Sequence, residues 1–297
     1  MIQDIAPFRL ANEYQNKKVQ KNDRLIGFSG KKIFLWQTDE GITYPTYEEM
    51  ENACRKQERA VPECRFLFAI GEEKFFLAEL DGIEPFGEYR FYEMFETRAM
   101  VRERKELVLA GATAWHLYQW YRDNRFCGRC AAKLVHEEKL RALRCPACGN
   151  LIFPKIAPAV IVAVTNGENI LMTKYANRQY KRYALIAGFT EIGETAEETV
   201  VREVMEETGV RVKNIRYYKS QPWGFDSNLL LGYFCELDGD DTITMDTEEL
   251  SVAEWVHYTD VPADVEGLSL TREMMTKFKT SFAGEERHRE INNYINS

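Results

Sequence analysis

Residues 188–210, GFTEIGETAEETVVREVMEETGV, decide how the C-terminal half of this 297-residue chain folds. Thr195 and Glu198 have the spacing of a capping box, and apolar residues recur at i,i+4 spacing after them. Gly209 provides a stop for a helix because glycine accepts the left-handed backbone of a C-cap. The pattern predicts a helix over residues 196–208.

The predicted helix is strongly acidic. Residues 188–210 contain seven glutamates and one basic residue, Arg202. Glu203, Glu206 and Glu207 stand at i, i+3 and i+4, so their carboxylates share one helix face, where like charges repel each other. A divalent cation turns that repulsion into coordination, and such oxygen ligands suit Mg²⁺ or Mn²⁺ that bridges to a phosphate. The alternative is a solvated acidic face without a ligand.

The stretch resembles the Nudix box, G-x5-E-x7-R-E-U-x-E-E-x-G-U with U aliphatic, at every specified position. The matching residues are Gly188, Glu194, Arg202, Glu203, Val204, Glu206, Glu207, Gly209 and Val210. The resemblance implies a Nudix fold, in which a mixed β-sheet lies in an α/β/α sandwich. It also implies Mg²⁺- or Mn²⁺-dependent hydrolysis of a nucleoside diphosphate linked to another group.

Site residues follow from the same resemblance. Glu203, Glu206 and Glu207 resemble the acids that bind the metal and activate water, and Arg202 resembles the residue that orients them. Ala187, just before the box glycine, would contribute its carbonyl as a metal ligand. The general base is left open among the glutamates, because it varies between family members.

Four of the seven cysteines form a second motif. Cys127, Cys130, Cys145 and Cys148 make two C-x2-C pairs separated by 14 residues, so that two thiolate pairs can close a tetrahedron around Zn²⁺. Four thiolates leave no open position, which predicts one structural zinc per chain. The alternatives are free or disulfide-bonded cysteines, and a ribbon that binds nucleic acid through the basic residues between the pairs.

A third motif follows the acidic helix at residues 220–228, Ser-Gln-Pro-Trp-Gly-Phe-Asp-Ser-Asn. By itself a Pro-Trp turn often anchors a loop to the core. The segment resembles the S-Q-P-W-P-F-P-x-S motif of the NADH pyrophosphatase branch of the Nudix hydrolases, which carries a four-cysteine zinc ribbon before its catalytic domain. Gly224 and Asp226 replace two prolines, and Asn228 replaces the last serine. These changes free the unbound loop and add an anion near a pyrophosphate.

The resemblance covers about residues 98 to 278 and implies further site residues. Phe189 and Trp223 would sandwich the nicotinamide ring, each from a different subunit of a homodimer, and a planar cationic ring suits such stacking. Glu249 would be a further metal-binding or catalytic carboxylate, unless it is a surface charge beside Glu248. The other substrate-binding residues implied are Phe153, Arg98, Gln221, Pro222, Gly224, Phe225, Asp226, Ser227 and Asn228.

Composition limits the class of protein. Hydrophobic residues at 45% and charged residues at 29% exclude a disordered chain, and the formal charge of −8 disfavours general binding to phosphate backbones or membranes. No signal-like N-terminus and no window of 18 uncharged apolar residues is present, and the C-x2-C pairs fit a reducing compartment. We therefore expect a cytoplasmic protein without membrane contact.

The chain is predicted to be α+β with three domains. These are an N-terminal α+β domain over 1–122, the zinc ribbon over 123–153 and the Nudix domain over 154–297. The first domain contains short apolar runs that indicate strands, such as 32–36 and 74–77, and then an apolar, mostly helical stretch over about 100–121.

Strand and helix patterns in the third domain are clear. Residues 159–164 form a β-branched run that predicts a buried strand, with Asn166-Gly167 as a hairpin turn after it. Residues 229–235 predict another strand, and residues 271–278 predict a closing helix.

The function that these resemblances imply is hydrolysis of the NAD(H) pyrophosphate to nicotinamide mononucleotide and AMP. The same chemistry would remove NAD from the 5′ end of NAD-capped RNA. One alternative is a hydrolase of ADP-ribose or another nucleoside diphosphate derivative, which the Gly224 and Asp226 replacements motivate. Another is a catalytically inactive nucleotide sensor or zinc-ribbon nucleic-acid binder, against which the complete set of box acids argues.

Overall fold

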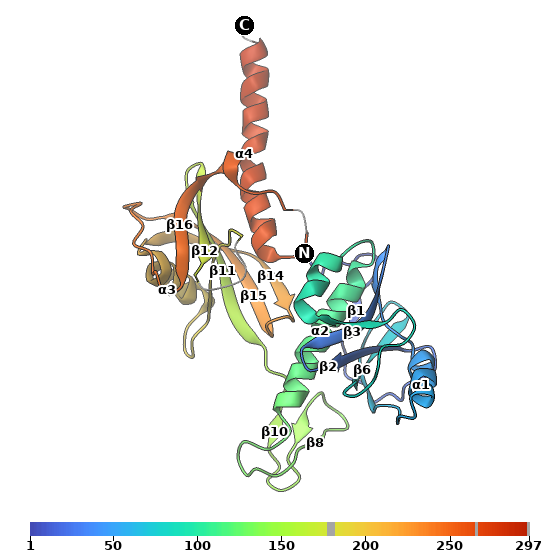
Figure 1. The fold of residues 1–297 in the computed structure, drawn as a ribbon. Coiled ribbons are helices and arrows are strands. Elements are labelled where there is room, and N and C mark those ends of the chain that lie inside the picture. The colour runs from blue at the N-terminus through green and yellow to red at the C-terminus, as the bar shows by residue number, and fades with distance from the viewer. Residues whose placement is uncertain (177–181, 265–266, 296–297) are drawn as a thin grey trace. The chain divides into compact units, whose positions relative to one another are not determined.

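The computed structural model of the protein describes residues 1–176, 182–264 and 267–295, with side chains up to residue 282 (Figure 1). The chain divides into two compact units. One is formed by residues 2–156 together with 223–227, and the other by Met1, 157–222 and 228–297. Both units contain a β-sheet with helices, as the α+β prediction requires.

The unit of residues 2–156 contains a sheet with strand order β1-β5-β6-β2-β3-β4, and β7 pairs with β3. The strands are β1 Leu10–Ala11, β2 Arg24–Ser29, β3 Lys32–Thr38, β4 Gly41–Thr43, β5 Cys64–Ile70, β6 Glu73–Glu79 and β7 Arg90–Glu93. The helices are α1 Tyr47–Lys56, the 3-10 helix η1 Met94–Met100 and α2 Lys105–Asp123. The predicted strands at 32–36 and 74–77 are confirmed.

Helix α2 begins later than the apolar pattern predicts. The predicted stretch starts at about residue 100, which is the last residue of η1, and the charged run 102–105 separates η1 from α2. Helix α2 is buried on most of its surface, and the rings of Phe28 and Tyr118 stack with their centroids 4.7 Å apart. A helix that is apolar on most sides lies inside a domain, so α2 forms part of the core of this unit.

The cysteine module has three short strands, β8 Val135–His136, β9 Leu143–Arg144 and β10 Leu151–Ile152, in the order β10-β9-β8. The Arg141 guanidinium donates to the carbonyl oxygen of Leu67 in β5 at 2.5 Å and to the side chain of Asn12 at 3.1 Å. This side chain therefore connects the ribbon to the N-terminal sheet.

The second unit contains a mixed sheet with strand order β14-β15-β11-β12-β16, and β13 pairs with β11. The strands are β11 Ala157–Asn166, β12 Asn169–Tyr175, β13 Ile186–Phe189, β14 Val212–Trp223, β15 Asn228–Leu237 and β16 Leu250–His257. Strand β11 runs parallel to β15 and antiparallel to β12 and β13. The predicted strands at 159–164 and 229–235 are confirmed, and Gly167 takes a positive φ of 57° in the hairpin turn.

Helices α3 (Ala196–Thr208) and α4 (Leu270–Ile295) lie on opposite faces of this sheet (Figure 1). Tyr233 of β15 joins the apolar cluster that packs against α3. Its neighbour Gly232 faces the other way, where a Cβ would come within 2.8 Å of the Met274 sulfur of α4. Because side chains alternate along a strand, the two helices cover opposite faces, and the α/β/α sandwich implied by the resemblance is confirmed.

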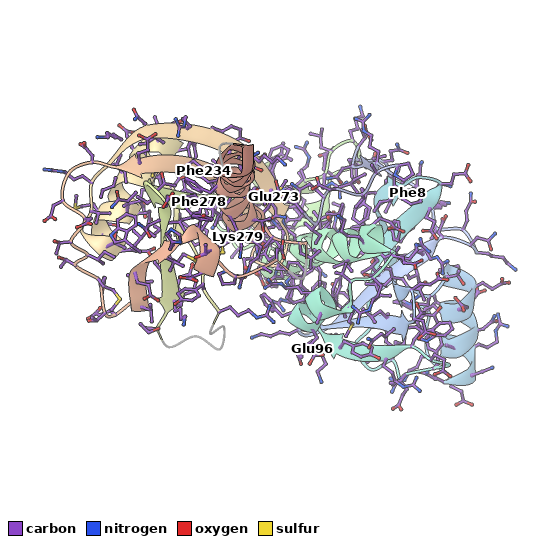
Figure 2. The ribbon with its side chains drawn as sticks, turned by 90° about the horizontal axis from the view of Figure 1, so that it is seen from above. Phe8, Glu96, Phe234, Glu273, Phe278 and Lys279 are labelled. Atoms are coloured by element: carbon purple, nitrogen blue, oxygen red, sulfur yellow. The ribbon has the colours of Figure 1, made fainter. Side chains whose placement is uncertain are left out.

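Helix α4 is longer than predicted. The sequence indicates a helix over 271–278, whereas α4 extends to Ile295. Among the α4 residues whose side chains are described, up to Phe282, the last buried apolar residue is Phe278, close to the end of the predicted helix. Figure 2 shows Glu273, Phe278 and Lys279 on this helix, near Phe234 of β15. The Glu273 carboxylate also accepts a hydrogen bond from the Lys219 ammonium group of β14 at 2.6 Å, which ties the first turn of α4 to the sheet.

Across the residues that the structure describes, every helix is too short or too polar to cross a membrane.

The N-terminus of α3 offers a test of the capping box. The Thr195 hydroxyl accepts from the Glu198 amide at 3.2 Å, and the Glu198 carboxylate accepts from the Thr195 amide at 2.8 Å. We expect Thr195→Ala to lower the free energy of unfolding by about 1 kcal/mol, measured by urea denaturation. Thr195→Ser keeps the hydroxyl and is the control. Equal stability of all three proteins would contradict a role for this cap.

Candidate functional site

Strand β13 and helix α3 form the candidate active site. Helix α3 spans the residues predicted for it, and Gly209 ends it with a φ of 71°. Gly188 of β13 pairs with Val160 of β11 and lies directly against the Glu203 side chain. A Cβ on Gly188 would lie 1.8–2.1 Å from the Glu203 carboxyl group, so a larger residue there would displace this carboxylate from its position beside β13.

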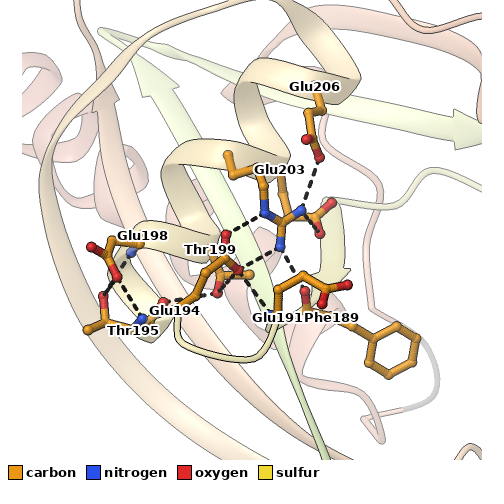
Figure 3. A network of polar contacts seen from close by, with 9 residues as sticks. Phe189, Glu191, Glu194, Thr195, Glu198, Thr199, Glu203 and Glu206 are labelled. Carbon is orange, nitrogen blue, oxygen red and sulfur yellow. Dashed lines mark hydrogen bonds and ion pairs between the residues drawn. The ribbon is translucent and has the colours of Figure 1, made fainter.

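The Arg202 guanidinium organises the acids of the box (Figure 3). Its Nε and Nη2 donate to the two carboxylate oxygens of Glu194, at 2.6 and 2.8 Å. Its Nη1 donates to Glu203 at 2.7 Å and to Glu206 at 3.0 Å, and Nη2 also donates to the Phe189 carbonyl at 2.9 Å. One cation thus fixes three carboxylates and the backbone of β13, which suits the orienting role that the resemblance implies.

Charge and burial set the protonation of this network. Hydrogen bonds from Arg202 and from the Glu191 amide lower the pKa of Glu194 to about 2, and the bonds to Glu194 in turn raise the pKa of Arg202. Burial raises the pKa of Glu203 despite the bond from Arg202, and the charges of Glu206 and Glu249 raise it further. Glu249 therefore acts electrostatically on Glu203, although it lies just before β16.

The three helix acids do not converge on one point. The exposed fraction of the side chain is 13% for Glu203 and 59% for Glu206, and Glu207 as a whole residue is 2% exposed. In the described ranges, only the four ribbon cysteines place three or more His, Cys, Asp or Glu ligand atoms within 4.8 Å of one another. Arg202 binds Glu203 and Glu206 through the same Nη1 atom, whereas the Glu207 side chain lies in the protein interior. Carboxylate oxygens are still the donor set that Mg²⁺ and Mn²⁺ require.

Two further residues border these acids. Ala187 lies on β13 beside Gly188 and pairs with Ile161 of β11, which places its backbone next to the strand position that Glu203 contacts. Glu194 was identified in the box but was not expected in the site. It is the main partner of Arg202, and its fixed position in the box is the sequence signal that could have revealed this role.

The four ribbon cysteines form a compact sulfur cluster. The Sγ atoms of Cys127 and Cys148 are 3.7 Å apart, those of Cys130 and Cys145 are 3.4 Å apart, and all four lie within 4.8 Å of one another. Four sulfurs at about 2.3 Å from a central Zn²⁺ are separated by about 3.8 Å in a tetrahedron. The geometry therefore fits the predicted structural zinc.

Backbone amides stabilise the thiolate form of two of these cysteines. The Arg129 amide donates to the Cys127 sulfur at 3.4 Å, which lowers the pKa of that thiol to about 6. The Cys148 amide acts in the same way on Cys145 and lowers its pKa. Zinc binds thiolates and not thiols, so these amides favour metal binding.

The ribbon offers less basic surface than its sequence indicates. The Arg141 side chain binds Leu67, as described above, and Arg144 forms an ion pair with Glu137 at 2.5 Å. These two arginines are half of the basic residues between the cysteine pairs. The alternative of a nucleic-acid-binding ribbon loses support, because their charges are already compensated or used for packing.

The 220–228 motif is a hairpin and not an isolated loop. Residues 220–223 end β14, residues 224–227 form the turn, and Asn228 begins β15. The exposed Pro222 lies in β14, at the edge of the sheet, where a missing amide is tolerated. Gln221 is buried, and its amide donates to the Leu268 carbonyl and accepts from the Leu270 amide, both at 2.7 Å. It holds the start of α4, so its predicted substrate contact stays a prediction.

The two aromatic residues predicted to sandwich a nicotinamide differ in exposure. Phe189 is 55% exposed, and Figure 3 shows its ring directed away from the Arg202 guanidinium. Trp223 is 8% exposed, and it belongs to the compact unit of residues 2–156. Phe153, in that same unit, is exposed. The sandwich between two subunits stays a prediction.

Packing explains one departure from the motif. A Cβ on Gly224 would lie 2.2 Å from the Ala112 carbonyl oxygen of α2, so neither proline nor any other side chain fits there without movement of backbone. The Trp115 indole of α2 also donates to the Phe225 carbonyl at 3.3 Å. The sequence analysis missed the contact between Gly224 and Ala112, because Ala112 is distant in the chain and belongs to no motif.

The turn after Phe225 contains two further predicted substrate contacts. Ser227 takes a positive φ of 60°, a left-handed conformation that non-glycine residues rarely adopt. The Asn228 side-chain oxygen is buried, and within the described chain it has no hydrogen-bond partner. Asn228 thus places a buried amide oxygen, without a hydrogen-bond partner among the described residues, at the position where the motif has serine.

Zinc analysis tests the sulfur cluster. We expect one zinc per chain by elemental mass spectrometry, and we expect Cys145→Ser to lose the metal and to melt at a lower temperature, because structural zinc stabilises the fold around it. Cys64→Ser is the matched control, since Cys64 lies outside the cluster. Retention of zinc by Cys145→Ser would contradict the four-thiolate site.

A double-mutant cycle tests the contact between Gly188 and Glu203. We expect Gly188→Ala to lower the free energy of unfolding by about 1–3 kcal/mol, because the methyl group overlaps the carboxylate. In a Glu203→Ala background the same substitution should cost clearly less, since the overlapping group is gone. Penalties that simply add in urea denaturation would show that this contact does not exist.

Comparison with known proteins agrees with this geometry. Residues 155–278 match the NUDIX domain family model, and residues 122–153 match the NADH pyrophosphatase zinc ribbon domain. Similar proteins are each named NAD-capped RNA hydrolase NudC. That of Salmonella paratyphi C is 35% identical over 175 residues, which is 59% of this chain and 68% of the relative.

Two further relatives carry the same name. The one from Pectobacterium carotovorum is 38% identical over 170 residues, which is 57% of this chain and 65% of the relative. The one from Citrobacter koseri is 34% identical over 196 residues, covering 65% of this chain and 76% of the relative. With the complete box and the sulfur cluster on one chain, these matches show that it belongs to the Nudix hydrolase family, in the branch with the NADH pyrophosphatase zinc ribbon.

Proposed function

We propose that this Nudix hydrolase cleaves the pyrophosphate bond of NAD(H) and releases nicotinamide mononucleotide and AMP. The observation that carries the proposal is the Arg202 network, which holds the box acids in order, on a chain with the NADH pyrophosphatase type of ribbon. The relatives named NAD-capped RNA hydrolases support the same class of substrate.

The catalytic metal would be Mg²⁺ or Mn²⁺, held by Glu203, Glu206 and Glu207 with Glu249 and the Ala187 carbonyl. Such an ion lowers the pKa of water and neutralises charge that develops on a pyrophosphate. Arg202 keeps Glu203 and Glu206 oriented through its two Nη1 hydrogen bonds. Burial of Glu207 strengthens the attraction of its carboxylate for a cation, because the local dielectric is low.

Recognition of the nicotinamide would begin at Phe189. Its carbonyl is bound by Arg202 while its ring is exposed, so one residue joins the acid network to an aromatic surface. A stacked cationic ring gains stabilisation from such a face. We propose that Trp223 of a second subunit completes the sandwich in a homodimer. Phe153, Arg98 and the 221–228 motif residues are the further proposed contacts.

NAD-capped RNA is a proposed larger substrate of the same site. The names of the similar proteins favour it, and the chemistry at the pyrophosphate is unchanged. With a net charge of −8, the chain would bind the RNA body weakly and in a salt-sensitive manner. A cytoplasmic location is part of this proposal and rests on the thiolate ribbon, which requires reducing conditions.

Contacts in the structure argue against the two other candidate functions. Gly224 and Asp226 suggested ADP-ribose as substrate, but Gly224 is explained by the contact with α2 and Asp226 binds the Trp223 indole. An inactive nucleotide sensor would not need the acids to be held by Arg202, yet Glu194, Glu203 and Glu206 all are.

Hydrolysis of NADH with Mg²⁺ or Mn²⁺, followed by product identification by liquid chromatography and mass spectrometry, tests the proposal. We expect AMP and reduced nicotinamide mononucleotide in equal amounts. Glu206→Gln should lower kcat by about 10²-fold or more, because it removes a metal ligand and a partner of Arg202. Glu191→Gln is the matched control, since this exposed acid lies at an unspecified position of the box.

Two results would contradict the proposal. A kcat/KM for ADP-ribose more than about tenfold above that for NADH would move the substrate to the ADP-ribose class. Unchanged hydrolysis in Glu206→Gln would show that the box acids do not carry the reaction.

A further inference from the structure

The turn of the 220–228 hairpin contains a specific polar contact. The Trp223 indole nitrogen donates to an Asp226 carboxylate oxygen at 3.0 Å. The Asp226 amide donates back to the Trp223 carbonyl at 3.3 Å, so the two residues bond to each other twice. Asp226 stands where the resembling motif has a proline, which could provide neither of these hydrogen bonds.

Arg98 covers the same indole. Its guanidinium carbon lies 5.0 Å from the Trp223 ring centroid and 6.0 Å from that of Phe225, within the range of cation–π attraction. The indole is therefore held in its plane by Asp226 and on one face by Arg98. Opposite charges contact the N–H edge and the π face, which is the complementary arrangement for an indole.

The rest of the turn is anchored to residues of the same compact unit. Gly224 lies against the Ala112 carbonyl, and the Phe225 carbonyl accepts from Trp115. The Phe225 ring stacks on Phe95, with centroids 5.8 Å apart. These contacts fix the backbone of the turn. The Trp223 side chain packs on the Phe225 ring, with centroids 4.9 Å apart, and Asp226 makes the hydrogen bond to its indole nitrogen.

We propose that Asp226 is a positioning residue, which orients the Trp223 indole against Arg98 and so gives this hairpin the rigidity that proline gives the common form of the motif. Gly224 cannot be proline because α2 is too close, and the hydrogen bond of Asp226 offsets the freedom that this glycine introduces. The carboxylate that the sequence analysis placed near a pyrophosphate accepts a hydrogen bond from an indole.

The proposal also concerns substrate affinity, and this part rests on the proposed function. If Trp223 stacks on a nicotinamide ring, its orientation must be set before the ligand arrives, because ordering it on binding costs affinity. Loss of the Asp226 hydrogen bond should then raise KM for NADH by about fivefold and leave kcat within about twofold, since the Asp226 carboxylate bonds to Trp223 and the reaction is assigned to the box acids.

Three variants separate hydrogen bonding from charge. Asp226→Ala removes the acceptor. Asp226→Asn keeps an acceptor oxygen and removes the charge, so it is the matched rescue variant. Arg98→Met removes the cation from the face of the indole and tests the second contact of the Trp223 ring separately.

The first readout is the indole N–H resonance of Trp223 in protein labelled with ¹⁵N-tryptophan, assigned with Trp223→Phe. It needs no substrate. We expect Asp226→Ala to shift this resonance and to speed its exchange with solvent, Asp226→Asn to preserve slow exchange, and Arg98→Met to shift the resonance through the lost cation. The second readout is the division of the effect between KM and kcat for NADH, where Asp226→Asn should restore most of the affinity.

Parental indole exchange in Asp226→Ala would overturn the proposal, and so would an Asp226→Asn variant that behaves like Asp226→Ala, because the acceptor would then be irrelevant. If the parent does not hydrolyse NADH, the proposed function fails. The indole exchange in the three variants still decides whether Asp226 positions Trp223.

Discussion

The candidate site depends on the ability of one guanidinium to hold several carboxylates together. Arg202 binds Glu194, Glu203 and Glu206 and also the backbone of β13, so it joins the helix that carries the acids to the strand beside it. Without this cation, adjacent glutamates on α3 would repel each other and destabilise the helix. With it, the acids are ordered before a metal binds, which reduces the cost of assembling the site.

The ribbon cysteines and the proposed metal site on α3 are arranged in opposite ways. The ribbon thiolates lie close enough for a tetrahedral ion, because short knuckles and backbone amides bring neutralising N–H groups to Cys127 and Cys145. The carboxylates of α3 are spread from buried to exposed. A closed thiolate site suits a structural ion, whereas an open set of oxygen ligands suits an ion that shares its coordination with a phosphate.

The 220–228 hairpin shows how a motif can change while its geometry is maintained. Its glycine is required by the approach of α2, and its aspartate bonds to the tryptophan that the motif retains. Judged from the motif alone, both replacements weaken the substrate assignment. Judged from the contacts, they belong to the packing of the turn, and the assignment no longer depends on them.

Local sequence patterns were sufficient to predict the limits of helix α3 and the residues of both motifs. The capping box, the i,i+4 apolar pairs and Gly209 gave α3 its correct limits, and the four cysteines and the box acids were identified by spacing, because these features depend on residues a few positions apart. Long-range contacts decided the rest. Only the fold brings Glu203 onto Gly188, Gly224 onto Ala112 and Gln221 onto the start of α4, since each pair is remote in sequence and joined by packing that no periodicity encodes.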